Sequence, residues 1–404
     1  MKTIEKLLII ATIAALLHSC VEGNAMQATI EKGLIRSAAQ AEILAKALEA
    51  DEDSLPRSFE HGRLVKSDSH WWCSGFFPGT LWYLYEATND TKWKDYAETY
   101  TWRLSSQQHT TDNHDIGFIL MCSFGNAYRL TNDTACIPVL LNGAQSLSTR
   151  FKPAVGLIRS WDTKTDKWQY PVIIDNMMNL ELLEWASHHS DSSRFADIAE
   201  SHAHLTMKNH FRRDLSSYHV VSYDPITGAV EKKNTHQGFS HESAWARGQA
   251  WGLYGYTMMY RETRNPVYLD HAKNIAKYII YHPHMPEDKI PYWDLNAPDI
   301  PEARRDASAA AIMSSAFIEL SSLATDDADF SRQCLSIAER QLQTLTSDAY
   351  LAEEGSNGGF ILKHSVGNLP KGTEVDVPLT YADYYYVEAL IRYKKLILRK
   401  EVKS

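Results

Sequence analysis

The links between helical segments alternate between short and long, and this alternation constrains the fold more than any other feature of the sequence. Apolar residues recur with helical spacing in twelve segments: 28–49, 74–88, 91–106, 115–130, 134–150, 175–189, 192–209, 242–262, 265–280, 305–324, 329–346 and 380–398. Tight links rich in helix-capping residues occur at Asn89-Asp90-Thr91, Thr131-Asn132-Asp133, Ser190-Asp191, Thr263-Arg264-Asn265 and Asp326-Asp327. Long links occur at 107–114, 151–174, 210–241, 281–304 and 347–379.

This pattern predicts stacked helical hairpins in one domain that covers residues 28–400. Six hairpins close into an all-α ring, an (α/α)6 toroid, in which the long links share one mouth. An open solenoid of hairpins is the alternative. Strand-like alternation is confined to short pieces near 218–223 and 359–363. Because function gathers in loops that a rigid scaffold positions, we expect the site at the mouth of the ring.

The first twenty residues have the features of a secretory signal peptide. Lys2 and Lys6 precede an apolar run, Leu7 to Leu17, that is too short to span a bilayer. The run ends in Leu17-His18-Ser19-Cys20, which resembles a bacterial lipobox. We therefore expect export to the periplasm or outer membrane of a Gram-negative bacterium, with a lipid on Cys20. Simple cleavage near Ser19 or Ala25 is the alternative.

The composition is that of an ordinary globular protein, with 44% hydrophobic and 23% charged residues. The net charge of -9 repels phosphate backbones and argues against a nucleic-acid partner. The chain also has 11 Trp and 21 Tyr, which fit either a large core or a sugar-binding cleft.

Asp115 and Asp175 each follow a long link and begin a helical segment. The simplest explanation is that each carboxylate caps its helix. Both are nevertheless enclosed by apolar residues and glycine, and burial together with a second carboxylate raises a carboxyl pKa. As a pair at one mouth they are credible acid and base groups.

The sequence lacks the motifs of metal sites, of cysteine-pair redox sites and of serine hydrolases. The histidines show no metal-ligand spacing, and the other cysteines, Cys73, Cys122, Cys136 and Cys334, form no Cys-x-x-Cys pair, so we expect no metal and no cofactor. A disulfide stays possible in an exported protein, but the sequence does not pair these cysteines. No Gly-x-Ser-x-Gly elbow is present, which argues against a serine hydrolase. Arg247 is hard to explain as a core residue; it needs a carboxylate partner, either Asp306 or a ligand.

Several clusters together resemble the unsaturated glucuronyl hydrolases, glycoside hydrolase family 88. They are His114-Asp115, Asp175-Asn176-Met177-Met178-Asn179, His236-Gln237-Gly238, Trp245-Ala246-Arg247-Gly248-Gln249-Ala250-Trp251-Gly252, and Asp383-Tyr384-Tyr385-Tyr386 with Glu388-Ala389-Leu390. The resemblance runs from about residue 70 to 395 and also implies the (α/α)6 ring. One departure is Ala382, where the family often has glycine.

The resemblance implies a reaction. Polysaccharide lyases leave a C4=C5 double bond on a terminal uronic acid, and this family removes that sugar by hydrating the double bond. Asp175 matches the general acid and base, and Asp115 matches the second essential carboxylate. The resemblance further implies that the substrate contacts Trp72, His114, Trp161, His219, Gln237, Trp245, Arg247 and Trp251.

The resemblance leaves the identity of the sugar open. Glycosaminoglycan fragments of the chondroitin, hyaluronan or heparin type are the expected substrates. Relatives that act on unsaturated rhamnogalacturonides from pectin share the fold and an Asp pair, so pectin fragments are the alternative. A lipoprotein that only binds sugars is a third possibility, against which the two carboxylates argue.

A basic loop near the end of the chain bears on substrate choice. Residues 361–372 contain Ser365 and Lys371 and no acidic residue. A flexible, solvated loop is the simplest interpretation. The more specific prediction is a sulfate subsite, because hydroxyl, backbone N–H and Lys groups together bind such anions, and some relatives use Ser and Lys of this loop in that way.

Overall fold

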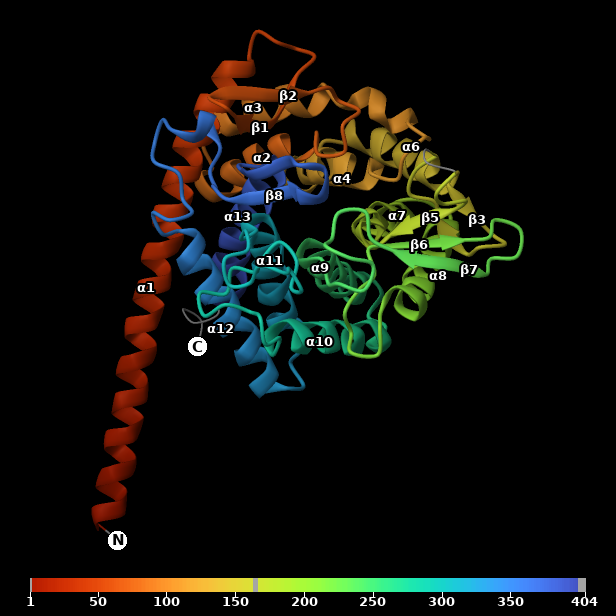
Figure 1. Cartoon of the computed structure of the whole chain (residues 1–404). Coiled ribbons are helices and arrows are strands. Elements are labelled where there is room, and N and C mark those ends of the chain that lie inside the picture. The colour runs from red at the N-terminus through yellow and green to blue at the C-terminus, as the bar shows by residue number, and fades with distance from the viewer. Residues whose placement is uncertain (1, 163–165, 399–404) are drawn as a thin grey trace.

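The computed structural model describes residues 2–162 and 166–398, with side chains from residue 25 onward. Figure 1 shows helices arranged around a common centre, with α1 extending far beyond the others at its N-terminal end. Most residues of the helices that line the centre are buried. In the described residues they are α2 (Phe76–Thr88), α4 (Ile116–Leu120) with α5 (Asn126–Thr131), α7 (Leu180–His188), α9 (Ala246–Thr263), α11 (Ala307–Leu323) and α13 (Thr380–Tyr393).

An outer layer of helices buries only one stripe of each helix against the inner layer, as expected for amphipathic segments. It comprises α1 (Lys2–Leu48), α3 (Thr91–Trp102), α6 (Cys136–Ser148), α8 (Arg194–His210), α10 (Pro266–Ile280) and α12 (Ala328–Leu345). The inner layer closes because α13 contacts both α11 and α2. The fold is therefore the predicted (α/α)6 toroid, and the open solenoid is excluded.

Short links join α2, α5, α9 and α11 to the outer helices that follow them, and predicted capping residues lie in these links. The link at Ser190-Asp191 differs, because α8 begins after Ser193 without a side-chain cap. Asn89 and Asn132 end their helices in the left-handed conformation, with φ of 58° and 56°. Asp90 begins α3 by accepting a hydrogen bond from the Lys92 N–H over 3.0 Å, and Asn265 begins α10 in the same way. These residues stop and restart the chain within a few positions, which forces the two helices of each hairpin to lie antiparallel.

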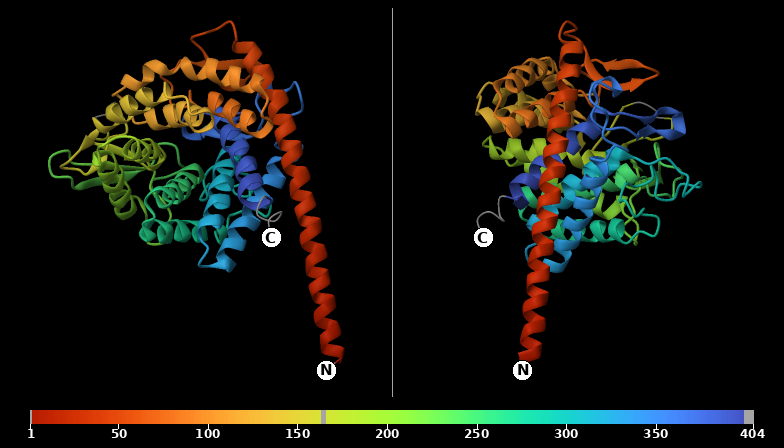
Figure 2. Two further views of the ribbon diagram at one scale, coloured as in Figure 1. Left: turned by 180° about the vertical axis from the view of Figure 1, so that it is seen from behind. Right: turned by 90° about the vertical axis from the view of Figure 1, so that its left-hand side faces the viewer.

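The long links carry the strands, and in the right-hand view of Figure 2 the β1–β2 and β8–β9 hairpins lie on one side of the helices. The strands form antiparallel pairs or one three-stranded sheet, β5-β6-β7. Their bounds are β1 Leu55–Glu60, β2 Arg63–Ser67, β3 Phe151–Lys152, β4 Leu157–Ile158, β5 Pro171–Ile173, β6 Val220–Tyr223, β7 Val230–Asn234, β8 Ser365–Asn368 and β9 Thr373–Val377.

The strand predicted near 218–223 is confirmed as β6, whereas the one predicted near 359–363 is wrong. That stretch has one isolated bridge, from Leu351 to Leu362, and pairing begins only at Ser365. Asp383 explains the difference, because its two carboxyl oxygens accept the backbone N–H groups of Ile361 and Leu362. Those donors are therefore not available to a strand partner.

The structure answers the question about disulfides that the sequence left open. Cys73, Cys122, Cys136 and Cys334 are all buried and unpaired, so no disulfide joins them. Within the described residues no helix is long and apolar enough to cross a membrane. The Cys20 side chain and the rest of the expected signal peptide lie outside the part whose side chains are described.

Candidate active site

The two carboxyls come from neighbouring elements of the inner ring. Asp115 immediately precedes α4, and Asp175 lies in the first turn of η3 (Ile174–Asn179), a 3-10 helix that leads into α7. A Cβ on Gly117 would lie 2.5 Å from Cα of Asn179, so glycine is required for this close approach. The Phe118 N–H also donates to Asn179 Oδ1 over 2.8 Å. Both carboxyls thereby lie at the mouth where the long links gather.

Asp115 does not cap its helix, although it occupies the capping position. Its side chain is 18% exposed and lies 3.5 Å from Nε2 of His114. Burial raises the pKa of the Asp115 carboxyl to about 7, although the nearby Arg150 charge lowers it. The capping explanation for Asp115 is therefore wrong, and the carboxyl exchanges protons near neutral pH.

Asp175 has the same unusual character. Its side chain is 13% exposed, and its Oδ2 has no hydrogen-bond partner in the described structure. Burial raises the pKa of Asp175 to about 7; the charge of Arg247 lowers it, and the charge of Asp115 raises it further. A carboxyl whose pKa is raised toward neutrality and that keeps an oxygen without a hydrogen bond is equipped to give and take a proton.

His219 is held beside Asp175 in one tautomer. Its Nδ1 accepts hydrogen bonds from the backbone N–H groups of His236 and Gln237, each over 3.1 Å. Burial holds the His219 pKa well below its usual range, so the ring is neutral and its proton lies on Nε2. That nitrogen faces Asp175 Oδ2 at 3.7 Å. The N–H direction therefore leads toward the free carboxyl oxygen.

Arg247 is fully buried and binds Asp306 over 3.2 Å, which is the first of the two partners that the sequence suggested. Its guanidinium also donates to the backbone oxygens of Val366 and Gly367 in β8, the latter over 2.7 Å. The Gln237 amide donates to the same Gly367 oxygen over 3.0 Å. Arg247 and Gln237 thus anchor the C-terminal loop beside the carboxyl pair, while the Arg247 charge still acts on Asp175.

Three tryptophan rings near Asp115 and Asp175 differ in their contacts and in their exposure. The ring centre of Trp245 lies 4.4 Å from Cζ of Arg247 and 4.4 Å from the ring centre of His219. Trp72 contacts Phe118 at the mouth and is partly exposed. Trp251 has no exposed surface, and its indole lowers the pKa of Asp175, so it forms the floor rather than a wall.

Three further expected contacts, Trp161, Lys371 and Ser365, differ in how far they are exposed. Trp161 is partly exposed and belongs to an outer aromatic group, 5.7 Å from Trp168 and 5.9 Å from His236. Lys371 is exposed at the end of η5 (Leu369–Lys371), whereas Ser365 has no exposed surface and its hydroxyl has no partner in the described structure. Ser365 and Lys371 therefore do not share an accessible surface in this conformation. Within the described residues no group of three or more His, Cys, Asp or Glu side chains is placed to hold a metal.

Tyr381 is a site residue that sequence reasoning did not select. It is 2% exposed, its hydroxyl lacks a hydrogen bond to the described residues, and its ring centre lies 4.9 Å from that of Trp72 and 5.3 Å from the Arg247 guanidinium. Asn176 and Asn179 were noticed only as part of a motif, yet they act on the pKa of His114 and Asp115 respectively. Contacts of this kind join different helices, so spacing along one segment does not reveal them.

The chain is similar along most of its length to proteins of known activity. The model of Glycosyl Hydrolase Family 88 matches residues 49–395. An unsaturated glucuronyl hydrolase from Formosa agariphila is 46% identical over 86% of this chain and 86% of its own. An unsaturated chondroitin disaccharide hydrolase from Streptococcus pneumoniae is 33% identical over 84% of this chain and 86% of its own. A crystal structure of an unsaturated glucuronyl hydrolase specific for heparin is 47% identical, with a TM-score of 0.88 over 92% of this chain and 98% of that one.

Proposed function

This chain belongs to glycosyl hydrolase family 88 and is a glycosidase, and we propose that it removes the 4,5-unsaturated uronic acid from the non-reducing end of glycosaminoglycan fragments. The observation that carries the proposal is the pair Asp115 and Asp175, each with a pKa raised to about 7 at one mouth of the ring. The C4=C5 double bond implies that a polysaccharide lyase supplies the substrate.

The proposed reaction is hydration of the double bond. Protonated Asp175 gives its proton to C4 of the unsaturated sugar, and the positive charge that develops is shared by C5 and the ring oxygen. Ionised Asp175 then takes a proton from the water that attacks C5. The resulting hemiketal opens, and the glycosidic bond breaks in the rearrangement. Asp175 ends the cycle protonated, so one residue serves as both acid and base. The usual carboxylate-separation rule for glycosidases does not apply to this route.

The surrounding residues have supporting roles in this proposal. Asp115 holds a sugar hydroxyl and keeps the Asp175 pKa high through its own charge. His219 directs its Nε2–H toward Asp175 Oδ2 and stabilises the ionised state of that carboxyl. Trp72 and Tyr381 offer ring faces to the sugar. Arg247 contributes positive charge near Asp175 and fixes β8, because its Nη1 and Nη2 groups bind Asp306 and the backbone oxygens of β8.

Heparin-type fragments are the first choice among glycosaminoglycans. The 47% identical structure is of an enzyme specific for heparin, whereas the relatives named for chondroitin disaccharides are 32 to 33% identical. Heparin fragments are sulfated, and Lys371 on the exposed end of η5 supplies a cation for a sulfate on the sugar that follows the cleaved bond. The remaining surface is acidic, so a local cation also guides an anionic fragment inward.

One assay distinguishes the candidate substrates. Lyase-digested heparin, chondroitin, hyaluronan and pectin are each offered at equal concentration, and the loss of double-bond absorbance is followed. Turnover of a glycosaminoglycan digest with none on pectin supports the proposal, and the highest kcat/KM on heparin disaccharides supports the finer choice. Turnover confined to pectin fragments would overturn both.

We also propose that the enzyme is exported and anchored through a lipid on Cys20. Support comes from the apolar run before Cys20 and the lipobox-like Leu17-His18-Ser19-Cys20. A mature lipoprotein carries several acyl chains, which is enough for stable anchoring. Cys20→Ser should move the protein from the membrane fraction to the soluble fraction, with Cys122→Ser as a control that leaves the distribution unchanged. An equal soluble distribution of wild type and Cys20→Ser would indicate simple secretion.

A further inference from the structure

A cavity of about 470 Å³ lies at the end of the ring opposite the carboxyl pair. Its lining comes from the C-terminal parts of inner helices, including Glu86 of α2, Arg129 of α5, Trp185 of α7 and Arg261 of α9. Asp115 and Asp175, in contrast, lie where their helices begin. We call this space the rear cavity, and the described residues that line it include none of the expected substrate contacts.

A layer of aromatic rings separates the rear cavity from the catalytic mouth. The ring centre of Trp251 lies 5.2 Å from that of Phe118 and 5.4 Å from that of Tyr385. Trp251 acts on the Asp175 pKa on the mouth side, while Phe118 and Tyr385 line the cavity on the other side. The cavity is therefore a separate space and not the deep end of the catalytic site.

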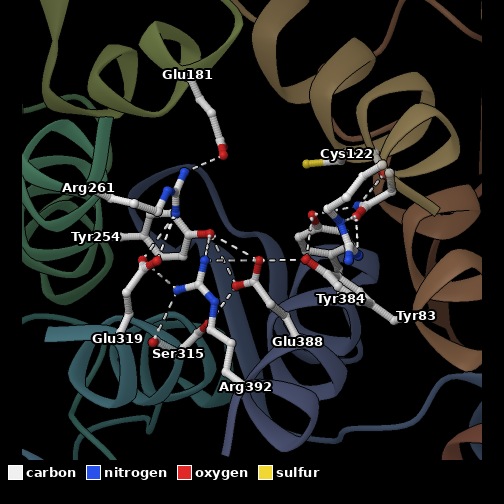
Figure 3. A network of polar contacts seen from close by, with 12 residues as sticks. Tyr83, Cys122, Glu181, Tyr254, Arg261, Ser315, Glu319, Tyr384, Glu388 and Arg392 are labelled. Carbon is white, nitrogen blue, oxygen red and sulfur yellow. Dashed lines mark hydrogen bonds and ion pairs between the residues drawn. The ribbon is translucent and has the colours of Figure 1, made fainter. Parts of the chain in front are cut away.

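The charged side chains around the rear cavity form ion pairs with one another. Figure 3 shows Glu388, Arg392, Glu319 and Arg261 from three helices pointing toward one another. Arg392 binds Glu319 over 3.0 Å, and Arg261 binds both Glu319, over 2.9 Å, and Glu181. The buried Glu388 carboxylate accepts the hydroxyls of Tyr83 over 2.7 Å and Tyr254 over 3.0 Å. Across the cavity Arg129 makes a two-point contact with Glu86.

One buried polar group in the wall is left without a partner. Tyr385 is 2% exposed and lines the cavity, yet its hydroxyl makes no hydrogen bond to any described residue and is not sealed off from the space. The Tyr384 hydroxyl is held only loosely, at 3.4 Å from the Tyr83 hydroxyl and 3.3 Å from the Asn126 amide. Buried hydroxyls normally find partners, so this wall offers hydrogen bonds that the protein itself does not use.

We propose that the rear cavity binds a neutral, hydroxyl-rich small molecule of one or two sugar rings. A charged ligand would meet no free counter-charge among groups that are already paired, and its desolvation would be uncompensated. A hydroxyl-rich ligand finds the Tyr385 hydroxyl, the loosely held Tyr384 hydroxyl and the aromatic side chains of Tyr254 and Trp185, which line the cavity. The volume also falls in the range of about 300–1,000 Å³ that small-molecule pockets occupy.

The test reads binding directly and does not depend on turnover. Crystals are soaked with N-acetylglucosamine, and its affinity is measured by calorimetry for the wild type, Tyr385→Phe and Tyr381→Phe. The two variants each remove one hydroxyl from α13, one turn apart, at the cavity and at the mouth respectively. We expect density in the rear cavity and about fivefold weaker binding there for Tyr385→Phe only, as loss of one hydrogen bond predicts.

Two further measurements sharpen the result. Cys122→Met should fill part of the cavity and abolish the rear density while thermal unfolding verifies the fold, because Cys122 lines the space. Glucosamine and glucuronic acid, the charged counterparts, should bind the cavity at least tenfold more weakly. Density at the mouth alone, or equal affinity in wild type and Tyr385→Phe, would overturn the proposal. The proposed glycosidase activity is tested separately, by turnover of unsaturated disaccharides, so failure of one proposal does not imply failure of the other.

Discussion

Nε2 of His219 lies 3.7 Å from Oδ2 of Asp175, while Nδ1 of the same ring accepts two backbone N–H groups. The backbone of His236 and Gln237 therefore decides which nitrogen carries the proton. Because that proton faces a buried carboxyl oxygen that has no hydrogen bond in the described structure, the loop after β7 prepares Asp175 for proton transfer. A protonated, cationic ring would not fit this arrangement, since Nδ1 has no place for a second proton.

His219→Asn should retain an oxygen acceptor near the Nδ1 position and lose the donor that faces Asp175. We expect kcat to fall by about 10²-fold, the lower part of the range for a group that assists proton transfer. Without that donor the ionised form of Asp175 is less stabilised, so the alkaline limb of the pH profile should move to higher pH. The exposed His188→Asn is the control, and an unchanged limb in His219→Asn would contradict the assigned role.

The pH dependence of the wild type follows from Asp175. The residue must be protonated to act as donor, and burial raises its pKa to about 7. Its protonated fraction declines as pH rises above that value, so kcat/KM should fall about tenfold per pH unit there. An Asp with an ordinary pKa would instead lose activity from about pH 4 upward. Full activity at pH 9 would mean that Asp175 is not the proton donor.

Buried histidines should make the protein unstable in acid. Burial lowers the pKa of His210 to about 4, and its Nε2 is paired with the Val172 oxygen. The unfolded chain takes up this proton below about pH 6.5 and the folded one does not, so stability is lost as pH falls through 6.5. For His210 alone the loss between pH 7 and pH 5 is about 2 kcal/mol. Urea unfolding of wild type and His210→Gln at both pH values measures it.

The comparison with His210→Gln matters because other groups act in the opposite direction. Burial raises the pKa of Asp383 to about 8, so the folded state holds a proton that the unfolded state has lost, and this contribution favours folding as pH falls. The slope of the wild-type free energy of unfolding against pH contains both effects. The difference between wild type and His210→Gln isolates the histidine, and an identical slope in the two proteins would contradict its assignment.

Sulfate recognition by the C-terminal loop is tested by its lysine. Lys371→Ala should lower kcat/KM for sulfated unsaturated disaccharides by about tenfold, or roughly 1.4 kcal/mol, and leave unsulfated ones nearly unchanged. Ser365→Ala should affect both substrates alike, since Ser365 is a buried residue of β8 next to Val366, whose backbone oxygen binds Arg247. A selective loss in Ser365→Ala would show instead that the loop opens to present its hydroxyl. Equal losses in Lys371→Ala would mean that the loop shapes the site without reading sulfate.

Most helices were predictable because residues close in the sequence determine where each helix begins and ends. Asp90, Asn265 and Asp327 each cap the helix that follows them through a side-chain hydrogen bond. The hairpin β1–β2 was missed, although His61 and Gly62 turn the chain with φ of 51° and 74°. Only the glycine is typical of such a turn, and a bulge between Pro56 and Ser58 interrupts the alternation of β1.

The site was predictable in its residue types and less so in their roles. Asp115 sits where a capping residue belongs, and sequence alone did not distinguish a cap from a free carboxyl. Arg247 was expected either to pair with Asp306 or to meet a ligand, and the fold settles this by bringing Asp306 and β8 to the same guanidinium. Tyr381 reaches Trp72 only because the ring closes between α13 and α2.

The most direct test of the account is the turnover of heparin unsaturated disaccharide by wild type and Asp175→Asn. The amide matches the carboxyl in shape but cannot deliver a proton to C4, so we predict an unchanged thermal unfolding transition and a kcat lowered by about 10²–10⁴-fold. Loss of double-bond absorbance measures both enzymes under the same conditions. If Asp175→Asn kept more than about a tenth of the wild-type kcat, Asp175 would not be the general acid and the central claim would fail.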